Sequence, residues 1–357
     1  MRGNTTRLYR SLPCAVACGA LIPLSGGCGA DPWSAHPTPV DIAVISLTPG
    51  IVNREALAQA ARLFYAEYPD DFDMIVLWSA PEFAPGYSFY LPVQNDVPGI
   101  GQAHFGREFF NDSAEFGSTR LQGIIWMSPD WRTKDASAED PASALGTLAH
   151  ETAHRWAAAP YFAEDNGHLS DGLLAGTAHW GFFLDTGSSP LGGNRWEHVK
   201  GSLYRATPVR TTLFCDLDLY LMGLITADDV PPIMLLTRPR TETGEPDTRF
   251  RVDSGRVTEL ITIAADAESV TISQIVAAEG LRRADEGFAA AEIRQAWVYV
   301  VSEAASPPDS DLEKLEAMQA RWSRFFDTAT RGLGSVTTVL QPGRTARDKR
   351  FHATELR

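Results

Sequence analysis

Cysteine is scarce in this chain of 357 residues. Of its four cysteines, Cys14, Cys18 and Cys28 fall at the N-terminus, and only Cys215 remains in the body of the chain. A single cysteine has no partner within the chain, so the sequence excludes a disulfide framework. Cys215 could act as a nucleophile, but a small buried hydrophobic residue is the favoured interpretation of a lone cysteine before residues 216–218.

Positive charge and long apolar runs are also lacking. The chain has 31 Lys and Arg against 45 Asp and Glu, which gives a net charge of -14, and its basic residues form no run. This balance argues against a nucleic-acid partner. Beyond the N-terminus no apolar stretch is long enough to span a membrane, and no repeats are visible. We therefore expect one large globular domain or two closely packed lobes.

Residues 1–27 are predicted to be a targeting segment rather than part of the fold. Three arginines precede a short apolar stretch at residues 14–24, which is followed by Ser25-Gly-Gly-Cys28. This order resembles a bacterial lipoprotein signal, which implies lipidation of Cys28, a membrane anchor and a place in the cell envelope. Leu24 lies one position further from the cysteine than usual, so ordinary secretion with cleavage near Ala30 stays open. Residues 28–39 are interpreted as a tether.

The strongest motif is H-E-x-x-H, formed by His150, Glu151 and His154. Residues four apart on a helix lie above one another, so the two imidazoles can bind one ion. Glu151 is rotated from His150 by about 100° and is free to hold a water instead. Zinc lowers the pKa of such a water to about 7, and the carboxylate can take its proton.

The residues around the motif predict a helix. Asp140 is the expected N-cap, Pro141 suits the first helical position and Pro160 lies where the helix should stop. Apolar residues recur at helical spacing on a face separate from the histidines, and this face is the expected core side. They are Leu145, Ala149, Ala153 and Trp156.

A catalytic zinc needs a third protein ligand. His179 is the first candidate, because an imidazole in an apolar and aromatic segment would be costly to bury unless it were bound. Asp218 is the alternative, since it opens a predicted helix, although it could equally act there as an N-terminal carboxylate. His168 is a third candidate, in a polar segment that is expected to be a solvated loop.

Hydrophobic patterning predicts the α+β class. The Pro- and Gly-rich stretch 81–117 is expected to be a long functional loop. Strand 121–127 could be a substrate-binding edge or plain core, strands 257–263 and 269–275 are expected to form a hairpin, and a lobe boundary is considered near 228–250. The other expected strands are 40–47, 72–78 and 295–302, the other helices are 55–68 and 312–326, and residues 344–357 are a charged tail.

Four segments carry a family resemblance: 94–101, 150–156, 178–185 with 192–194, and 217–224. On them the chain resembles zincin-type metallopeptidases and, more narrowly, a group of bacterial exported proteins. The resemblance implies a zincin-like mixed sheet over residues 40–343 with an active-site helix. The astacin-like Gly and His after His154 and the thermolysin-like Asn-Glu helix are both missing, so neither familiar subclass fits.

The leading hypothesis from the sequence is an exported zinc-dependent endopeptidase that acts on proteins or peptides. His150, His154 and His179 would hold Zn²⁺, with Glu151 as general base and then proton donor to the leaving amine. Tyr220 or Arg155 would stabilise the oxyanion. The alternatives are a non-catalytic surface or binding protein that keeps the zincin fold, and a zinc hydrolase of a non-peptide bond such as a cell-wall amide.

Overall fold

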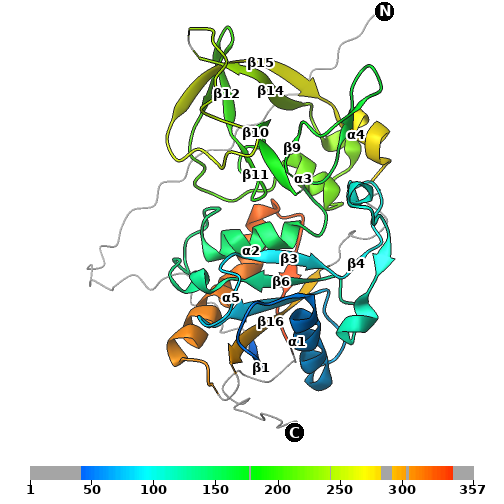
Figure 1. The fold of residues 1–357 in the computed structure, drawn as a ribbon, viewed down its shortest axis with the longest axis vertical. Coiled ribbons are helices and arrows are strands. Elements are labelled where there is room, and N and C mark those ends of the chain that lie inside the picture. Colours follow the sequence, from blue (N-terminus) through cyan, green and yellow to red (C-terminus); the bar gives the residue numbers. More distant parts are fainter. Residues whose placement is uncertain (1–41, 177, 242, 283–291, 303–304, 341–357) are drawn as a thin grey trace, which may run out of the picture. The chain divides into compact units, whose positions relative to one another are not determined.

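The computed structural model describes residues 42–340, except residues 177, 242, 283–291 and 303–304. This part of the chain contains five α-helices and several β-sheets, which is compatible with the α+β class (Figure 1). None of its helices is long and apolar enough to cross a membrane. The expected lipidation site at Cys28 and the tail 344–357 lie outside the described residues.

The first sheet is parallel apart from one edge strand. Its order is β1-β16-β2-β6-β3, with a short β17 paired to β16, and only β3 runs antiparallel to its neighbour β6. Every residue of β2 and β6 is buried, as expected for parallel strands covered on both faces. The strands are β1 (Ile42–Leu47), β2 (Met74–Ser79), β3 (Phe89–Pro92), β6 (Gly123–Met127), β16 (Ile293–Ser302) and β17 (Val336–Thr337).

These bounds confirm the predicted strands 40–47, 72–78, 121–127 and 295–302 within two residues at each described end. The interpretation of 121–127 as a substrate-binding edge is wrong, because β6 lies between β2 and β3. The edge strand is β3, which comes from the stretch predicted to be a loop. That stretch also contains two short strands, β4 (Gln94–Asn95) and β5 (Phe110–Asn111).

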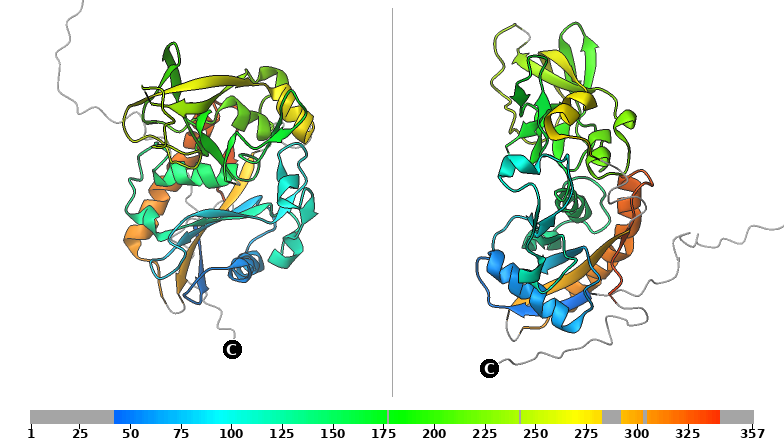
Figure 2. Two further views of the ribbon diagram at one scale, coloured as in Figure 1. Left: turned by 45° about the horizontal axis from the view of Figure 1, so that its top comes forward. Right: turned by 90° about the vertical axis from the view of Figure 1, so that its right-hand side faces the viewer.

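Helices cover both faces of the first sheet. α1 (Arg54–Glu67) begins at Asn53, whose side chain accepts a hydrogen bond from the Ala56 N–H, and lies on the opposite face from α2 (Ala144–Ala153) (Figures 1 and 2). α5 (Asp309–Ala329) shares the face of α2: Trp322 donates to Gln295 of β16, and Gln295 donates to Thr152. The predicted helices 55–68 and 312–326 are confirmed.

The second sheet is built mainly from antiparallel strands. Its order is β11-β10-β14-β15-β13-β12, with β9 paired to β10, and β10 and β11 are parallel. Its strands contribute to a separate apolar cluster that includes Phe182, Trp196 and Ile263. The strands are β9 (Leu174–Ala175), β10 (His179–Asp185), β11 (Gly192–Asn194), β12 (Trp196–Lys200), β13 (Leu203–Ala206), β14 (Ile233–Arg240) and β15 (Ile261–Val270).

The predicted hairpin of 257–263 with 269–275 is wrong. β15 runs without a break from Ile261 to Val270, and Thr271 then caps α4 (Ile272–Glu279). Asp266 and Glu268, the polar residues that suggested a turn, lie within β15. This strand pairs antiparallel with β14. The considered lobe boundary near 228–250 includes β14, an interior strand of this sheet. The chain passes from the first sheet to the second between β6 and β9 and returns between β15 and β16.

Candidate metal centre

α2 carries the H-E-x-x-H motif and begins at Ser143. The Ser143 side chain accepts a hydrogen bond of 2.9 Å from the Gly146 N–H, so the predicted N-cap at Asp140 is wrong. Asp140 instead closes the preceding turn by accepting from the Ala142 N–H at 2.8 Å. The helix ends at Ala153 with His154 as its C-cap, well before Pro160. The predicted core face is confirmed, since the four apolar residues named for it are buried.

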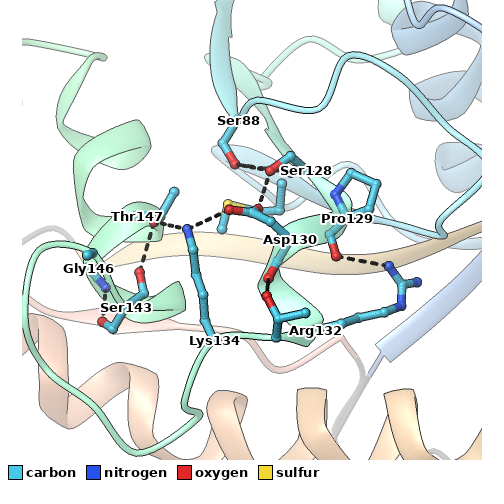
Figure 3. A network of polar contacts seen from close by, with 12 residues as sticks. Ser88, Ser128, Pro129, Asp130, Arg132, Lys134, Ser143, Gly146 and Thr147 are labelled. Atoms are coloured by element: carbon cyan, nitrogen blue, oxygen red, sulfur yellow. Dashed lines mark hydrogen bonds and ion pairs between the residues drawn. The ribbon is translucent and has the colours of Figure 1, made fainter.

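A polar network holds the first turns of α2 against the end of β6 (Figure 3). The Lys134 ammonium lies 3.0 Å from Thr147 Oγ1 and 3.0 Å from Asp130 Oδ2. Thr147 in turn donates to the Ser143 carbonyl at 2.8 Å. Because Thr147 lies one helical turn before Glu151, this network fixes the helix that carries the motif.

Three histidines converge in the structure. The Nε2 atoms of His150 and His154 are 3.0 Å apart, and His179 Nε2 lies 3.1 Å from His150 Nε2. One ligand atom from each lies within 4.8 Å of the others. His179 is the first residue of β10, so the second sheet supplies it. The structure thus brings together the leading third candidate and the two histidines of the motif.

The surroundings of the histidines fit a bound cation. His150 Nδ1 lies 2.8 Å from the Pro190 carbonyl, which can only accept, so Nδ1 carries the proton and the Nε2 lone pair faces the cluster. Burial lowers the pKa of all three, that of His150 to about 4, and therefore keeps them neutral. Nitrogens about 2.0–2.1 Å from a tetrahedral zinc would be about 3.3 Å apart, close to the spacing found.

Glu151 follows His150 on α2, and one of its carboxylate oxygens has no partner among the described residues. The residue is 4% exposed, and its Oε2 is buried with no hydrogen bond from any described residue. Burial raises its pKa to about 8, opposed by the charge of Lys134. An unpartnered buried carboxylate is costly. Its cost is understandable if the site normally holds a further polar group beside the three histidines.

Asp218 lies outside the histidine cluster. It belongs to α3 (Asp216–Leu221), where Oδ2 accepts from the Cys215 N–H at 2.9 Å and Oδ1 accepts from Trp180 Nε1 at 2.7 Å. Successive strand residues point to opposite faces, so Trp180 and Asp218 are on the other side of β10 from His179. Asp218 therefore caps α3 and fixes the start of β10.

The structure gives the three other candidates surroundings of their own. Tyr220 is buried, and its hydroxyl accepts from the Arg282 N–H at 3.0 Å. His168 is exposed in the turn between β7 (Phe162–Ala163) and β8 (Leu169–Ser170). Cys215 is half-buried at the N-cap of α3, and burial raises the pKa of its thiol, which favours the interpretation as a packed residue.

Sequence reasoning missed a cavity of about 220 Å³ that opens beside His154. Arg155 lines it, together with residues of β3 and β4 that precede the motif by some sixty positions. Arg155 had been considered only for oxyanion binding, and the one available signal was the polar run Gln94-Asn-Asp96 before a Pro-Gly pair.

Neither a protein-family model nor a curated protein nor a solved structure matches the chain. The zincin resemblance seen in the sequence therefore stays a prediction, and the site must be judged by its own geometry.

Proposed function

We propose that this protein is a zincin-like, zinc-dependent peptidase in which His150, His154 and His179 hold the ion. The observation that carries the proposal is the convergence of three imidazole nitrogens, two of them from the helix that also carries the buried, unpartnered carboxylate of Glu151. Three protein ligands leave one coordination position open, as in catalytic rather than structural zinc sites. The exposure of His179 is consistent with access to that position.

Zinc bound at this site would supply an activated water and a Lewis acid for the scissile carbonyl. The protein's own groups supply the remaining chemistry. Glu151 accepts the proton of the attacking water and returns it to the leaving amine. Pro190 fixes the tautomer of His150. We give Tyr220 no catalytic role, since its hydroxyl accepts from the Arg282 N–H and no contact of the described residues joins it to the histidines.

The edge strand β3 supports a peptide as the substrate. β3 is the last strand of the first sheet and pairs on one side only, with β6, among the described residues. An extended peptide can add to such an edge through main-chain hydrogen bonds. A non-catalytic binding protein would have no use for the cost of burying Glu151, and no described feature favours a cell-wall amide.

Turnover by a Glu151→Gln variant tests the proposal. Gln keeps the size of the side chain but cannot accept the proton, so zinc content should persist while the rate of cleavage of an unfolded protein mixture falls by about 10² to 10⁴. The exposed Glu164→Gln variant is the matched control. Wild-type cleavage by Glu151→Gln would remove Glu151 from the mechanism, and loss of zinc would make it a ligand.

We also propose that the protein is anchored to the bacterial cell envelope through a lipid on Cys28, the residue after the small-residue run 25–27. Radiolabelled palmitate should be incorporated by the wild type and not by Cys28→Ala. An unlabelled wild-type protein cleaved near Ala30 would show ordinary secretion and would leave the peptidase proposal untouched.

A further inference from the structure

The cavity beside His154 is lined by small apolar side chains and by the buried guanidinium of Arg155. Three alanines, Ala157, Ala159 and Ala178, line it and leave space, while Arg155 and the Gln102 amide supply polar groups. No Asp or Glu is among the described residues that line it. Since His154 is both a lining residue and a proposed zinc ligand, a group in this cavity would lie next to the reacting bond.

Arg155 is fixed by three side-chain acceptors. Its Nε donates to Gln122 Oε1 at 3.0 Å, Nη1 to Asn95 Oδ1 at 2.9 Å and Nη2 to Asp96 Oδ1 at 3.0 Å. These bonds engage three of the five N–H groups of a guanidinium. The side chain of Arg155 is only 3% exposed, whereas that of its carboxylate partner Asp96 is 84% exposed. Solvent therefore screens Asp96, and the charge at the cavity wall is that of Arg155.

The wall opposite α2 is held in place before any ligand binds. Gly101 has a φ of 84°, and a Cβ there would lie 2.4 Å from the Ala159 carbonyl oxygen, so the segment packs directly on the chain that leaves α2. His104 then stacks on Tyr161 with 3.7 Å between ring centroids and lies 2.7 Å from Glu279 of α4. A preformed wall costs little ordering entropy when a substrate side chain enters.

We infer that this cavity is a specificity pocket for an acidic side chain, Glu or Asp, in the substrate residue next to the scissile bond. The inference rests on the proposed peptidase function. A guanidinium with N–H groups to spare, in a pocket without carboxylates, matches the planar acceptor pair of a carboxylate. Lys or Arg in the same position would meet the charge of Arg155 in a site with little water to screen it.

Cleavage-site profiling on a peptide library tests this pocket. Wild-type protein should prefer Glu over Lys beside the cleaved bond by about tenfold or more. Asp96→Asn removes the competing carboxylate and should increase that preference. Gln102→Glu places a negative charge in the wall and should reduce or reverse it. The control Asp165→Asn, in the exposed turn before β8, should match the wild type.

Binding to the Glu151→Gln variant gives a readout that needs no turnover. Two hexapeptides that differ only in Glu or Lys at one position are titrated into this zinc-loaded variant, and the Glu peptide should bind about tenfold more tightly. Equal binding, or cleavage without an acidic preference that responds to Gln102→Glu, overturns the pocket while leaving the peptidase intact. Failure of the wild type to cleave any peptide overturns the peptidase, and the binding ratio then judges the pocket alone.

Discussion

The two sheets contribute to the candidate metal centre in different ways. The first sheet supports α2, and a single helix there carries two ligands and the proposed base. The second sheet contributes one residue, His179 at the start of β10, which is held in place from behind by Trp180 and Asp218. Two of the three proposed ligands are thus encoded by local helical spacing, and the third depends on how two distant parts of the chain pack.

Removing one ligand from each region should have the largest effect. His154→Ala and His179→Ala should each weaken zinc binding by more than the roughly 100-fold that follows loss of an outer hydrogen-bond partner. The measurement is competitive zinc titration against a chelator. His168→Ala is the matched control and should bind like the wild type. Near-wild-type zinc affinity in His179→Ala would confine the site to α2 and show that the second sheet supplies no ligand.

Asp218→Asn should have a smaller effect, because in this account Asp218 acts on the strand and not on the ion. Asn can still accept from Trp180, so we expect zinc affinity to fall by no more than about 10- to 100-fold. The same titration measures it, with Asp216→Asn as control, since Asp216 pairs with Arg331 away from Trp180. A loss larger than that of His179→Ala would make Asp218 the ligand.

Tyr220→Phe should have the smallest effect. It removes the acceptor of the Arg282 N–H, so the free energy of unfolding should fall by about 1 kcal/mol, as is typical for one hydrogen bond. Urea unfolding followed by circular dichroism measures this change. Cleavage rates should stay at the wild-type value. A drop in turnover of tenfold or more with zinc retained would return Tyr220 to the active site.

The same two regions differ in how far the sequence predicts them. β2 and β6 of the first sheet are buried on both faces, so they appear as continuous apolar runs, and the motif helix is visible from i, i+4 spacing alone. β15 was predicted as two strands, because its polar residues Asp266 and Glu268 suggested a turn. β14 carries Pro239 and two arginines, and no strand was predicted there.

Other features of the site could not be decided from sequence patterns. Ser143 and Asp140 are both good N-caps, and only the observed bond to Gly146 decides between them. The four residues of β3 lie in a Pro- and Gly-rich stretch and carry no clear alternation. Arg155 meets Asn95 across sixty positions, so its pocket could not be inferred from spacing.

X-ray absorption at the zinc edge tests the central claim most directly, namely that three imidazoles from both regions hold one ion. The zinc-loaded protein should show three histidine nitrogens at about 2.0–2.1 Å and one water oxygen, and His179→Ala should reduce the number of histidine nitrogens to two. A wild-type spectrum with only two imidazoles, or with a carboxylate or thiolate as the third protein ligand, would contradict the account.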